Sequence, residues 1–322
     1  MTVATSYDEV PYESHPYAQT HPSRLAVVAR LFGLTPPPIE TARVLELGAA
    51  AGGNLVPIAE AFPDSWCVGI DLSARQVADG EQWVRKLGLR NVSLRHASIT
   101  DVDDTYGTFD YVICHGVFSW VPTAVREAIL DVCARRLAPN GVAYVSYNTY
   151  PGWHMRGMIR DMMRYHALRF SDTTQRVGQA RALLDFLAQS CRQDGPYPTL
   201  LKSELESVRR QADHYLFHEH LEEVNDPLYF HQFVAMAKAH GLRYLGEARV
   251  GDAAQVDPHV RERPFDRRGE EEGRDEGVLR AGIQGFELGG RVAVRNRNVH
   301  RAPRLLQCDR RNSGARRALP SI

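Results

Sequence analysis

The sequence lacks the features of a membrane protein and of a secreted one. No apolar run approaches the roughly 18 residues that a helix needs to cross a bilayer. The first residues show neither the basic start nor the apolar stretch of a secretory signal. The five cysteines are scattered, without the close pairs of a zinc site or a redox motif, so we expect free thiols. These absences predict a cytoplasmic protein that has no membrane partner and binds no metal.

Lysine is also scarce, because the 39 basic residues include only Lys86, Lys202 and Lys238. Acidic residues number 39 as well, so the formal net charge of the 322-residue chain is zero. A chain without excess positive charge has no general attraction for nucleic acid. We therefore expect no nucleic-acid partner. The oligomeric state cannot be predicted from these features.

The middle of the chain alternates between two kinds of pattern. Between residues 41 and 150, short apolar runs typical of buried strands alternate with amphipathic stretches typical of helices. This alternation predicts an α/β domain in which a parallel sheet carries helices on both faces, as in Rossmann-like folds. We expect five strands here, in the runs RVLELG, WCVGIDL, NVSLRHASI, FDYVICHG and GVAYVSYNTY.

The flanking regions have different patterns. Residues 1–40, rich in Tyr, His and Pro, are expected to form an N-terminal cap segment with one helix near residues 23–33. Residues 151–250 predict four helices and a returning strand, and thus a mostly helical substrate or regulatory region. Residues 251–322 hold 15 Arg and no Lys, mixed with acidic residues and glycine, which favours a disordered tail.

A loop of glycine and alanine follows the first expected strand, in the stretch VLELGAAAGGN (residues 44–54). It is not a P-loop, because no Lys and Ser or Thr follow its last glycine. It also lacks the G-x-G-x-x-G spacing of dinucleotide sites, and the carboxylate of Glu46 would repel a diphosphate. S-adenosyl-L-methionine has no phosphate and carries an ammonium and a sulfonium, both of which Glu46 would attract. The loop therefore favours this cofactor.

Polar residues at the ends of the next strands fit the rest of such a ligand. Asp71 ends the second strand, where a carboxylate can accept hydrogen bonds from both ribose hydroxyls. Ser98 and Asp101 follow the third strand, and they either bond the adenine edge or cap a turn. His115 ends the fourth strand and is either a neighbour of the sulfonium or a core histidine.

Several stretches resemble the class I S-adenosylmethionine-dependent methyltransferases. They are similar in particular to a bacterial subfamily that carries a methyltransferase regulatory domain and includes the rickettsial protein lysine methyltransferases. The similar stretches are SYDEVPYESHPYAQTHPSRLAVVARLFGL (6–34), VLELGAAAGGNLVPIA (44–59), CHGVFSWVP (114–122) and SYNTYPGWHMRGMIRDMMRYH (146–166). The resemblance covers about residues 6–250 and implies a methyltransferase with a protein lysine amine as its acceptor. The family's late, closing strand is matched only faintly, by RAPRLLQCDR (301–310), so we expect residues beyond about 251 not to pack as in relatives.

The motif positions and the aromatic residues together define a candidate site. The resemblance implies that the cofactor loop uses Glu46, Gly48, Gly52 and Asn54 and that the ribose carboxylate is Asp71. With their neighbours, the expected cofactor-binding residues are Glu46, Gly48, Ala50, Gly52, Asn54, Asp71, Leu72, Ser98, Ile99 and His115. The expected acceptor-binding residues are Trp120, Tyr150, Trp153, Tyr12 and Tyr17. The candidates for catalysis are Tyr147, Asn148 and His154.

The same residues are compatible with other roles. In a purely structural alternative, the aromatic residues pack the helical region onto the core and bind no acceptor. Two other functions are also compatible with the sequence: methylation of a small molecule, and binding of the cofactor by a regulatory protein without turnover. A deep closed pocket would favour a small acceptor, and an open groove would favour a protein.

Overall fold

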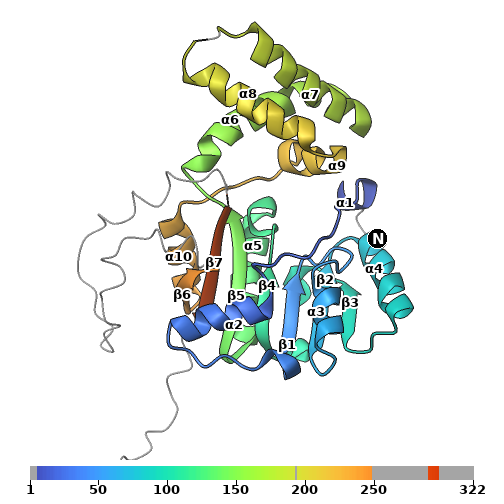
Figure 1. Cartoon of the computed structure of the whole chain (residues 1–322), viewed down its shortest axis with the longest axis vertical. Coiled ribbons are helices and arrows are strands. Elements are labelled where there is room, and N and C mark those ends of the chain that lie inside the picture. The colour runs from blue at the N-terminus through green and yellow to red at the C-terminus, as the bar shows by residue number, and fades with distance from the viewer. Residues whose placement is uncertain (1–5, 193, 249–288, 297–322) are drawn as a thin grey trace, which may run out of the picture.

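The computed structural model describes residues 6–192 and 194–248, together with the backbone of residues 289–296. Its centre is a seven-stranded sheet with the strand order β3-β2-β1-β4-β5-β7-β6 (Figure 1). The first five strands are parallel, and β7 runs antiparallel to both of its neighbours. The strands are β1 (Arg43–Leu47), β2 (Trp66–Asp71), β3 (Val92–His96), β4 (Phe109–Cys114), β5 (Leu137–Asn148), β6 (Leu242–Glu247) and β7 (Gly289–Asn296). This confirms the predicted Rossmann-like α/β fold.

Helices cover both faces of the sheet. One face packs against α2 (Pro22–Leu31), α3 (Leu55–Ala61) and α4 (Ala74–Leu87), and the other against α5 (Thr123–Arg136) and α10 (Phe230–Ala239). Successive strand residues therefore enter opposite cores: Val44 faces the first group of helices and Leu45 faces the second. Burial on both sides explains why these strands read as short, continuous apolar runs.

The ends of α4 show how local sequence sets an element. The hydroxyl of Ser73 caps the helix by accepting a hydrogen bond from the backbone nitrogen of Gln76 at 3.2 Å. Gly88 ends the helix with φ of +68°, in the left-handed region that glycine adopts at little cost. Ser73, at the start of this helix, and Asp71, at the end of β2, lie at the edge of the site described below.

A second, helical layer lies beyond the carboxyl ends of the strands (Figure 1). It consists of α6 (Gly152–Ala167), α7 (Thr173–Ser190), α8 (Pro196–Arg210), α9 (Asp213–Leu216) and the π-helical turn η5 (Phe217–Leu221). These helices share a core of their own that includes Ile159, Met163, Leu184 and Leu201. The region expected over residues 151–250 is thus divided, because α10 and β6 return to the sheet.

The strand β7 corrects the expectation for the C-terminal part of the chain. Residues 289–296 lie within the segment expected to be disordered, yet they pair with β5 and β6 and close the sheet. The stretch GGRVAVRN alternates Arg or Ala with Val, which is a strand pattern that the charged composition around it concealed. The stretch RAPRLLQCDR lies outside the described residues, together with the rest of the expected tail.

Short elements complete the described chain. They are the helix α1 (Ser6–Glu9) and the 3-10 turns η1 (Ile39–Thr41), η2 (Ile99–Asp101), η3 (Asp104–Tyr106) and η4 (Phe118–Trp120). No helix in the described parts has the length and apolar character required to cross a bilayer.

Candidate active site

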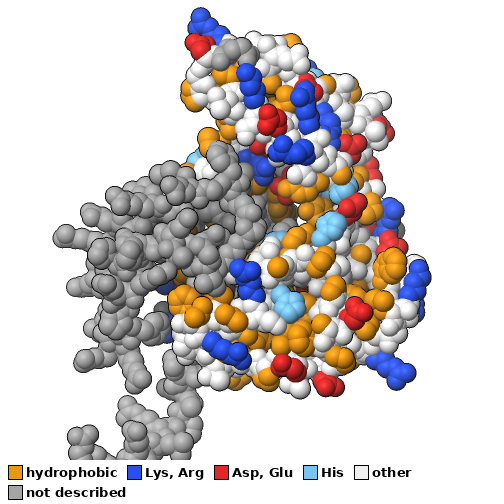
Figure 2. All heavy atoms as spheres, viewed as in Figure 1, with side chains coloured by type: hydrophobic (Ala, Val, Ile, Leu, Met, Phe, Trp, Pro, Cys, Tyr) orange, Lys and Arg blue, Asp and Glu red, His pale blue; other side chains and the backbone are white. Residues whose placement is uncertain are grey.

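A cavity of about 880 Å³ lies between the carboxyl ends of the strands and the helical layer. Its walls come from the loop after β1, the ends of β2, β4 and β5, the N-terminal segment, the start of α6 and the turn η5. Figure 2 shows the surface hollowed where the two layers meet, with histidine side chains beside the hollow. A cavity of this size can enclose most of a nucleoside-sized ligand.

The loop after β1 needs residues with almost no side chain. Gly48 has φ of +75°, and a Cβ there would lie 2.5 Å from Cγ2 of Val117. A Cβ on Gly53 would lie 2.3 Å from the carbonyl oxygen of Ser14. Ala50 has φ of +49°, a conformation that costs energy for a residue with a Cβ. Its backbone nitrogen donates to Oδ2 of Asp71 at 2.8 Å, which helps to hold this turn.

Glu46 is a buried carboxylate, 4% exposed, that lines the cavity at the end of β1. Its Oε1 accepts a hydrogen bond from Nδ2 of Asn54 at 2.7 Å, while its Oε2 has no partner among the described residues. Burial raises the pKa of Glu46 to about 8, the Asn54 hydrogen bond opposes this, and the charge of Asp71 adds to it. The cavity thus contains a buried oxygen that a cationic ligand group would satisfy.

Asp71 lies at the end of β2 and lines the same cavity. It accepts hydrogen bonds from the backbone nitrogens of Ala50 and Ser73, each at 2.8 Å. Burial raises the pKa of Asp71, and these hydrogen bonds counteract the shift by favouring the ionised form. Its oriented carboxylate can accept further hydrogen bonds from hydroxyl groups of a ligand.

The residues expected near an adenine ring form a capped turn. The Ser98 hydroxyl accepts from the backbone nitrogen of Thr100, and the Asp101 carboxylate accepts from that of Ser98. Of the two candidates, Ser98 lines the cavity, next to Ile99 and Leu72, whereas Asp101 does not. Ser98 and Asp101 therefore cap a turn, which was one of the two expected roles, and Ser98 also lies beside the cavity.

His115 lies at the end of β4, in contact with the N-terminal segment. Its ring centroid is 4.1 Å from that of Tyr17. Its Nδ1 lies 3.1 Å from Oγ of Ser146 and 3.2 Å from the hydroxyl of Tyr144. His115 and Tyr17 both line the cavity, and the Glu46 charge contributes, after burial, to raising the pKa of Tyr17. The pair thus closes the cavity near Glu46.

Aromatic side chains line the part of the cavity next to β5. The rings of Trp120 and Trp153 meet edge to face, with centroids 5.9 Å apart. Tyr147 stacks on Phe233, and its buried hydroxyl has no partner among the described residues. Asn148 also lines the cavity, with its Nδ2 donating to Asn225 at 2.9 Å.

Three expected site residues do not line the cavity. Tyr150 and His154 stack on each other at 4.0 Å, and Nε2 of His154 lies 3.1 Å from the hydroxyl of Tyr229. For His154 the reason is helical phase: α6 begins at Gly152, so neighbouring residues point about 100° apart, and Trp153 takes the buried direction. Gly52 instead packs beneath the loop, where a Cβ would meet Leu94 at 3.0 Å.

The N-terminal segment, residues 6–17, crosses the cavity, and we call it the strap. It binds the sheet layer at two points. Asp8 accepts a hydrogen bond from the Ser73 hydroxyl at 2.6 Å, and the Ser14 hydroxyl accepts one from the backbone nitrogen of Gly53 at 2.8 Å. The strap therefore covers the loop and the end of β2.

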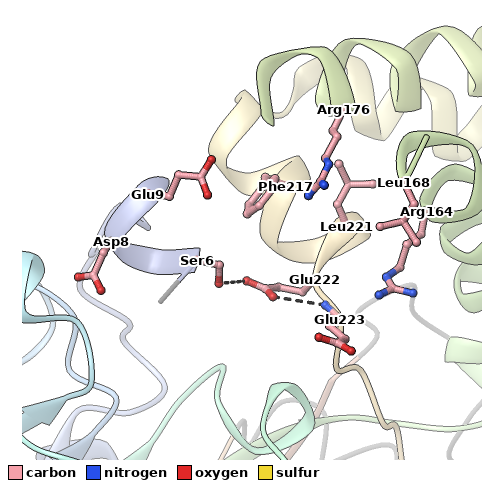
Figure 3. Close-up of a pocket in the computed structure, with 10 residues that line it drawn as sticks. All are labelled: Ser6, Asp8, Glu9, Arg164, Leu168, Arg176, Phe217, Leu221, Glu222 and Glu223. Atoms are coloured by element: carbon pink, nitrogen blue, oxygen red, sulfur yellow. Dashed lines mark hydrogen bonds between the residues drawn. The ribbon is translucent and has the colours of Figure 1, made fainter. Parts of the chain in front are cut away.

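The strap also binds the helical layer, as Figure 3 shows. The Ser6 hydroxyl donates to the Glu222 carboxylate. In addition, Nε2 of His218 lies 2.7 Å from the carbonyl oxygen of Val10. Beside α1 lies a second, more open pocket of about 580 Å³, which includes Arg164 and other charged residues. Ser6 and Glu222 line both the pocket and the main cavity, so their hydrogen bond lies at the boundary between them.

The sequence interpretation missed the helical layer's contribution to the cavity. The residues concerned are Arg156, His214, Tyr215, His218, Glu219 and Glu222. A signal was present in the stretch HYLFHEHLEE, where titratable side chains recur at helical spacing instead of leaving one apolar face. No group of three or more potential metal-ligating side chains occurs in the described part of the chain.

Two family models match the chain. Residues 44–141 match a methyltransferase domain, and residues 212–270 match a predicted methyltransferase regulatory domain. The first match contains the loop after β1 and Asp71. The second begins in the helical layer and includes the histidine-rich turn that lines the cavity.

The chain is similar to proteins from two Rickettsia species. RP789 of Rickettsia prowazekii is 51% identical over 245 residues, which are 76% of this chain and 44% of that protein. RP028 of the same organism is 42% identical over 241 residues, which are 74% of this chain and 96% of RP028. The structure of PKMT2 from Rickettsia typhi in complex with AdoHcy superposes with a TM-score of 0.74 at 34% identity, covering 89% of this chain and 55% of that one. The chain thus spans about half the length of RP789 and PKMT2.

Proposed function

The chain belongs to the S-adenosylmethionine-dependent methyltransferases that carry a methyltransferase regulatory domain, and we propose that it transfers a methyl group from S-adenosyl-L-methionine to a protein lysine amine. The coarser part of this proposal, a methyl donor bound at the loop after β1, has support from the fold and from the related structure that contains AdoHcy. The lysine acceptor has support from the sequence resemblance and from the chemistry of the cavity.

The observation that carries the proposal is the unpartnered Oε2 of Glu46. It is buried at the cavity wall, where an unsatisfied polar atom is unfavourable. The ammonium of the donor's methionine moiety would satisfy it and would favour the ionised form of the carboxylate. Asp71 would accept hydrogen bonds from the ribose hydroxyls, and Ser98 and Ile99 lie where the adenine would follow. The residues present therefore fit the donor.

The donor supplies, when bound, a methyl group on a positively charged sulfur that is already activated for in-line displacement. The protein's own residues bind and orient the reactants and keep water out. The strap and the helical layer would perform the last task, because both cover the cavity from the side opposite the sheet. The ring of Tyr17 beside His115 would help to close the cavity around the reacting groups.

A lysine acceptor suits the aromatic lining. Its ammonium must lose a proton before nitrogen can attack, and burial among apolar side chains favours the neutral amine. Aromatic faces attract a cation as it enters. Trp120, Trp153 and Tyr147 supply such surfaces beside the sheet.

Calorimetric titration of the full chain with S-adenosyl-L-methionine tests the cofactor assignment, with NAD as the control ligand. We expect micromolar binding, about −8 kcal/mol, that Glu46→Ala and Asp71→Ala abolish. Transfer of a labelled methyl group to a histone mixture then tests the acceptor, with the same proteins acetylated on lysine as the control. Label in the acetylated proteins would contradict a lysine acceptor. Binding without transfer to any protein or small amine would indicate a regulatory protein.

A further inference from the structure

Glu219 lines the cavity and has no role in the proposed binding of the cofactor. It belongs to the turn η5 and lines the cavity from the helical layer. Within the described parts of the chain it forms neither a hydrogen bond nor an ion pair. Its neighbours differ, since Glu222 binds Ser6 and His218, and Glu204 binds Arg156. Glu219 is thus a half-buried acceptor that protein groups leave available.

Tyrosine side chains share the cavity with this carboxylate. Burial is the main cause of the raised pKa of Tyr7, Tyr12, Tyr17 and Tyr215, and the charge of Glu219 adds a smaller contribution to each. All four also line the cavity. Three come from the N-terminal segment and one from the helix α9, one turn before Glu219. A carboxylate among aromatic rings is a favourable environment for an organic ammonium.

Two arginines whose charges act on Glu219 donate hydrogen bonds to other groups. Arg156 on α6 donates to Glu204 on α8 at 3.1 Å. Arg160 on α6 donates to the backbone carbonyl of Glu222. Their positive charges, together with that of His218 when protonated, oppose the rise that burial causes in the pKa of Glu219. Burial therefore raises the pKa of Glu219 in spite of these positive charges, and no ion pair to the described residues neutralises the carboxylate.

Tyr17 lines the same cavity as both Glu219 and the cofactor-side carboxylate Glu46. Glu46 and Glu219 both influence the same phenol of Tyr17, although one belongs to the sheet and the other to the helical layer. Glu46 faces the loop that would hold the donor. Glu219 lines the cavity from the helical layer, across from the strand ends that carry this loop.

We propose that Glu219, with Tyr12, Tyr17 and Tyr215, forms the binding site for the protonated amine of the acceptor and takes its proton; this inference rests on the proposed function. The ammonium gives one proton to the carboxylate, which becomes a carboxylic acid. The lone pair left on nitrogen forms the new N–C bond, while the C–S electron pair of the bound donor stays on sulfur. The product is a methylated ammonium, and Glu219 returns its proton to water after release.

Binding of a model amine to the full chain tests the site without turnover. The probe is Nα-acetyl-lysine methylamide, followed by saturation-transfer NMR at pH 7, and its neutral control is the Nε-acetylated form. We expect the charged probe to bind at least tenfold more tightly than the neutral one. Glu219→Gln should abolish this preference, whereas Glu223→Gln, an exposed residue outside the main cavity, should keep it. Tyr215→Leu, which removes a ring but no carboxylate, should weaken the charged probe several-fold.

Cofactor titration of the same variants separates the two proposals. Glu219→Gln should bind S-adenosyl-L-methionine within about threefold of the unchanged protein, which also demonstrates that it folds. Equal binding of the charged probe to Glu219→Gln and to the unchanged protein would overturn the cation site, as would equal binding of the charged and neutral probes. If the unchanged protein binds the amine but not the cofactor, the proposed function fails and the cation site stands.

Discussion

The imidazole of His218 lies flat against the ring of Tyr7, with centroids 4.3 Å apart and planes 3° from parallel. One residue belongs to the strap and the other to the helical layer, 211 positions later in the chain. The contact joins the two structures that cover the proposed donor site. The stability of the strap should therefore determine how long a bound donor stays.

Tyr7→Ala should accelerate release of S-adenosyl-L-methionine. Aromatic pairs contribute about 0.5–1.5 kcal/mol beyond their buried area, so we expect roughly a three- to tenfold faster dissociation rate. Stopped-flow displacement by excess AdoHcy measures it. Tyr165→Ala is the matched control, because Tyr165 is 71% exposed on α6 and remote from the strap's contacts. An unchanged rate in Tyr7→Ala would show that the strap does not limit release.

Glu46→Gln should lose donor binding and yet stabilise the empty protein at alkaline pH. The folded-state pKa of about 8 lies above the unfolded value, so the protonated carboxyl contributes stability that is lost as pH rises through 8. Glutamine does not ionise. The difference in unfolding free energy between the Glu46→Gln variant and the unchanged protein should therefore shift by roughly 2–3 kcal/mol in favour of the variant between pH 6 and pH 9. Denaturant unfolding at both pH values measures this gain, with the exposed Glu206→Gln as control; a gain that is independent of pH would refute the assignment.

Donor binding should release protons at neutral pH. A group with a pKa of about 8 is roughly 90% protonated at pH 7, and an ammonium beside it favours the carboxylate. We expect the release of close to one proton per donor bound, and a binding constant that improves from pH 6 to pH 8. Calorimetry at pH 7 in phosphate and in Tris detects this as a buffer-dependent enthalpy. The difference should disappear in any Glu46 variant that still binds, and equal enthalpies for the unchanged protein would contradict a neutral Glu46.

Gly53→Ala should weaken donor binding by displacing the strap. The new Cβ would lie 2.3 Å from the Ser14 carbonyl, a backbone atom that can move only with its segment. We expect at least tenfold weaker binding in the calorimeter, together with a lower melting temperature. Gly157→Ala is the matched control: it lies within α6, and a Cβ there would meet no atom within 4 Å apart from its chain neighbours and the backbone of its own helix, so alanine should be neutral or stabilise by about 0.5–1 kcal/mol. Normal affinity in Gly53→Ala would mean that the strap is not needed for binding.

The parts of the site that follow from neighbouring residues were predictable from the sequence. A carboxylate before a glycine loop and another after the second strand define Glu46 and Asp71 by local spacing, and both line the cavity. The failures arose from orientation and from distance along the chain. Trp153 and His154 are adjacent, and the helix start that decides which of them points inward cannot be located to one residue from sequence. Glu219 reaches the site only through tertiary packing.

The strand β7 was missed for a different reason. Its eight residues lie among strongly charged sequence, and the composition of the whole segment outweighed a short alternating pattern. Pairing with β5 and β6 on either side stabilises the strand conformation, which the local sequence favours only weakly.

The position of β7 also sets an order for folding. It is the last strand along the described chain, yet it lies between β5 and β6. Until residues 289–296 have left the ribosome, β5 has an unpaired edge and β6 has no neighbour. An unpaired edge is a template for another chain, and pairing across a long separation in sequence is slow. Residues 289–296 must therefore be synthesised before this half of the sheet can form, and a nascent chain stalled before residue 289 would leave the edge of β5 open to aggregation.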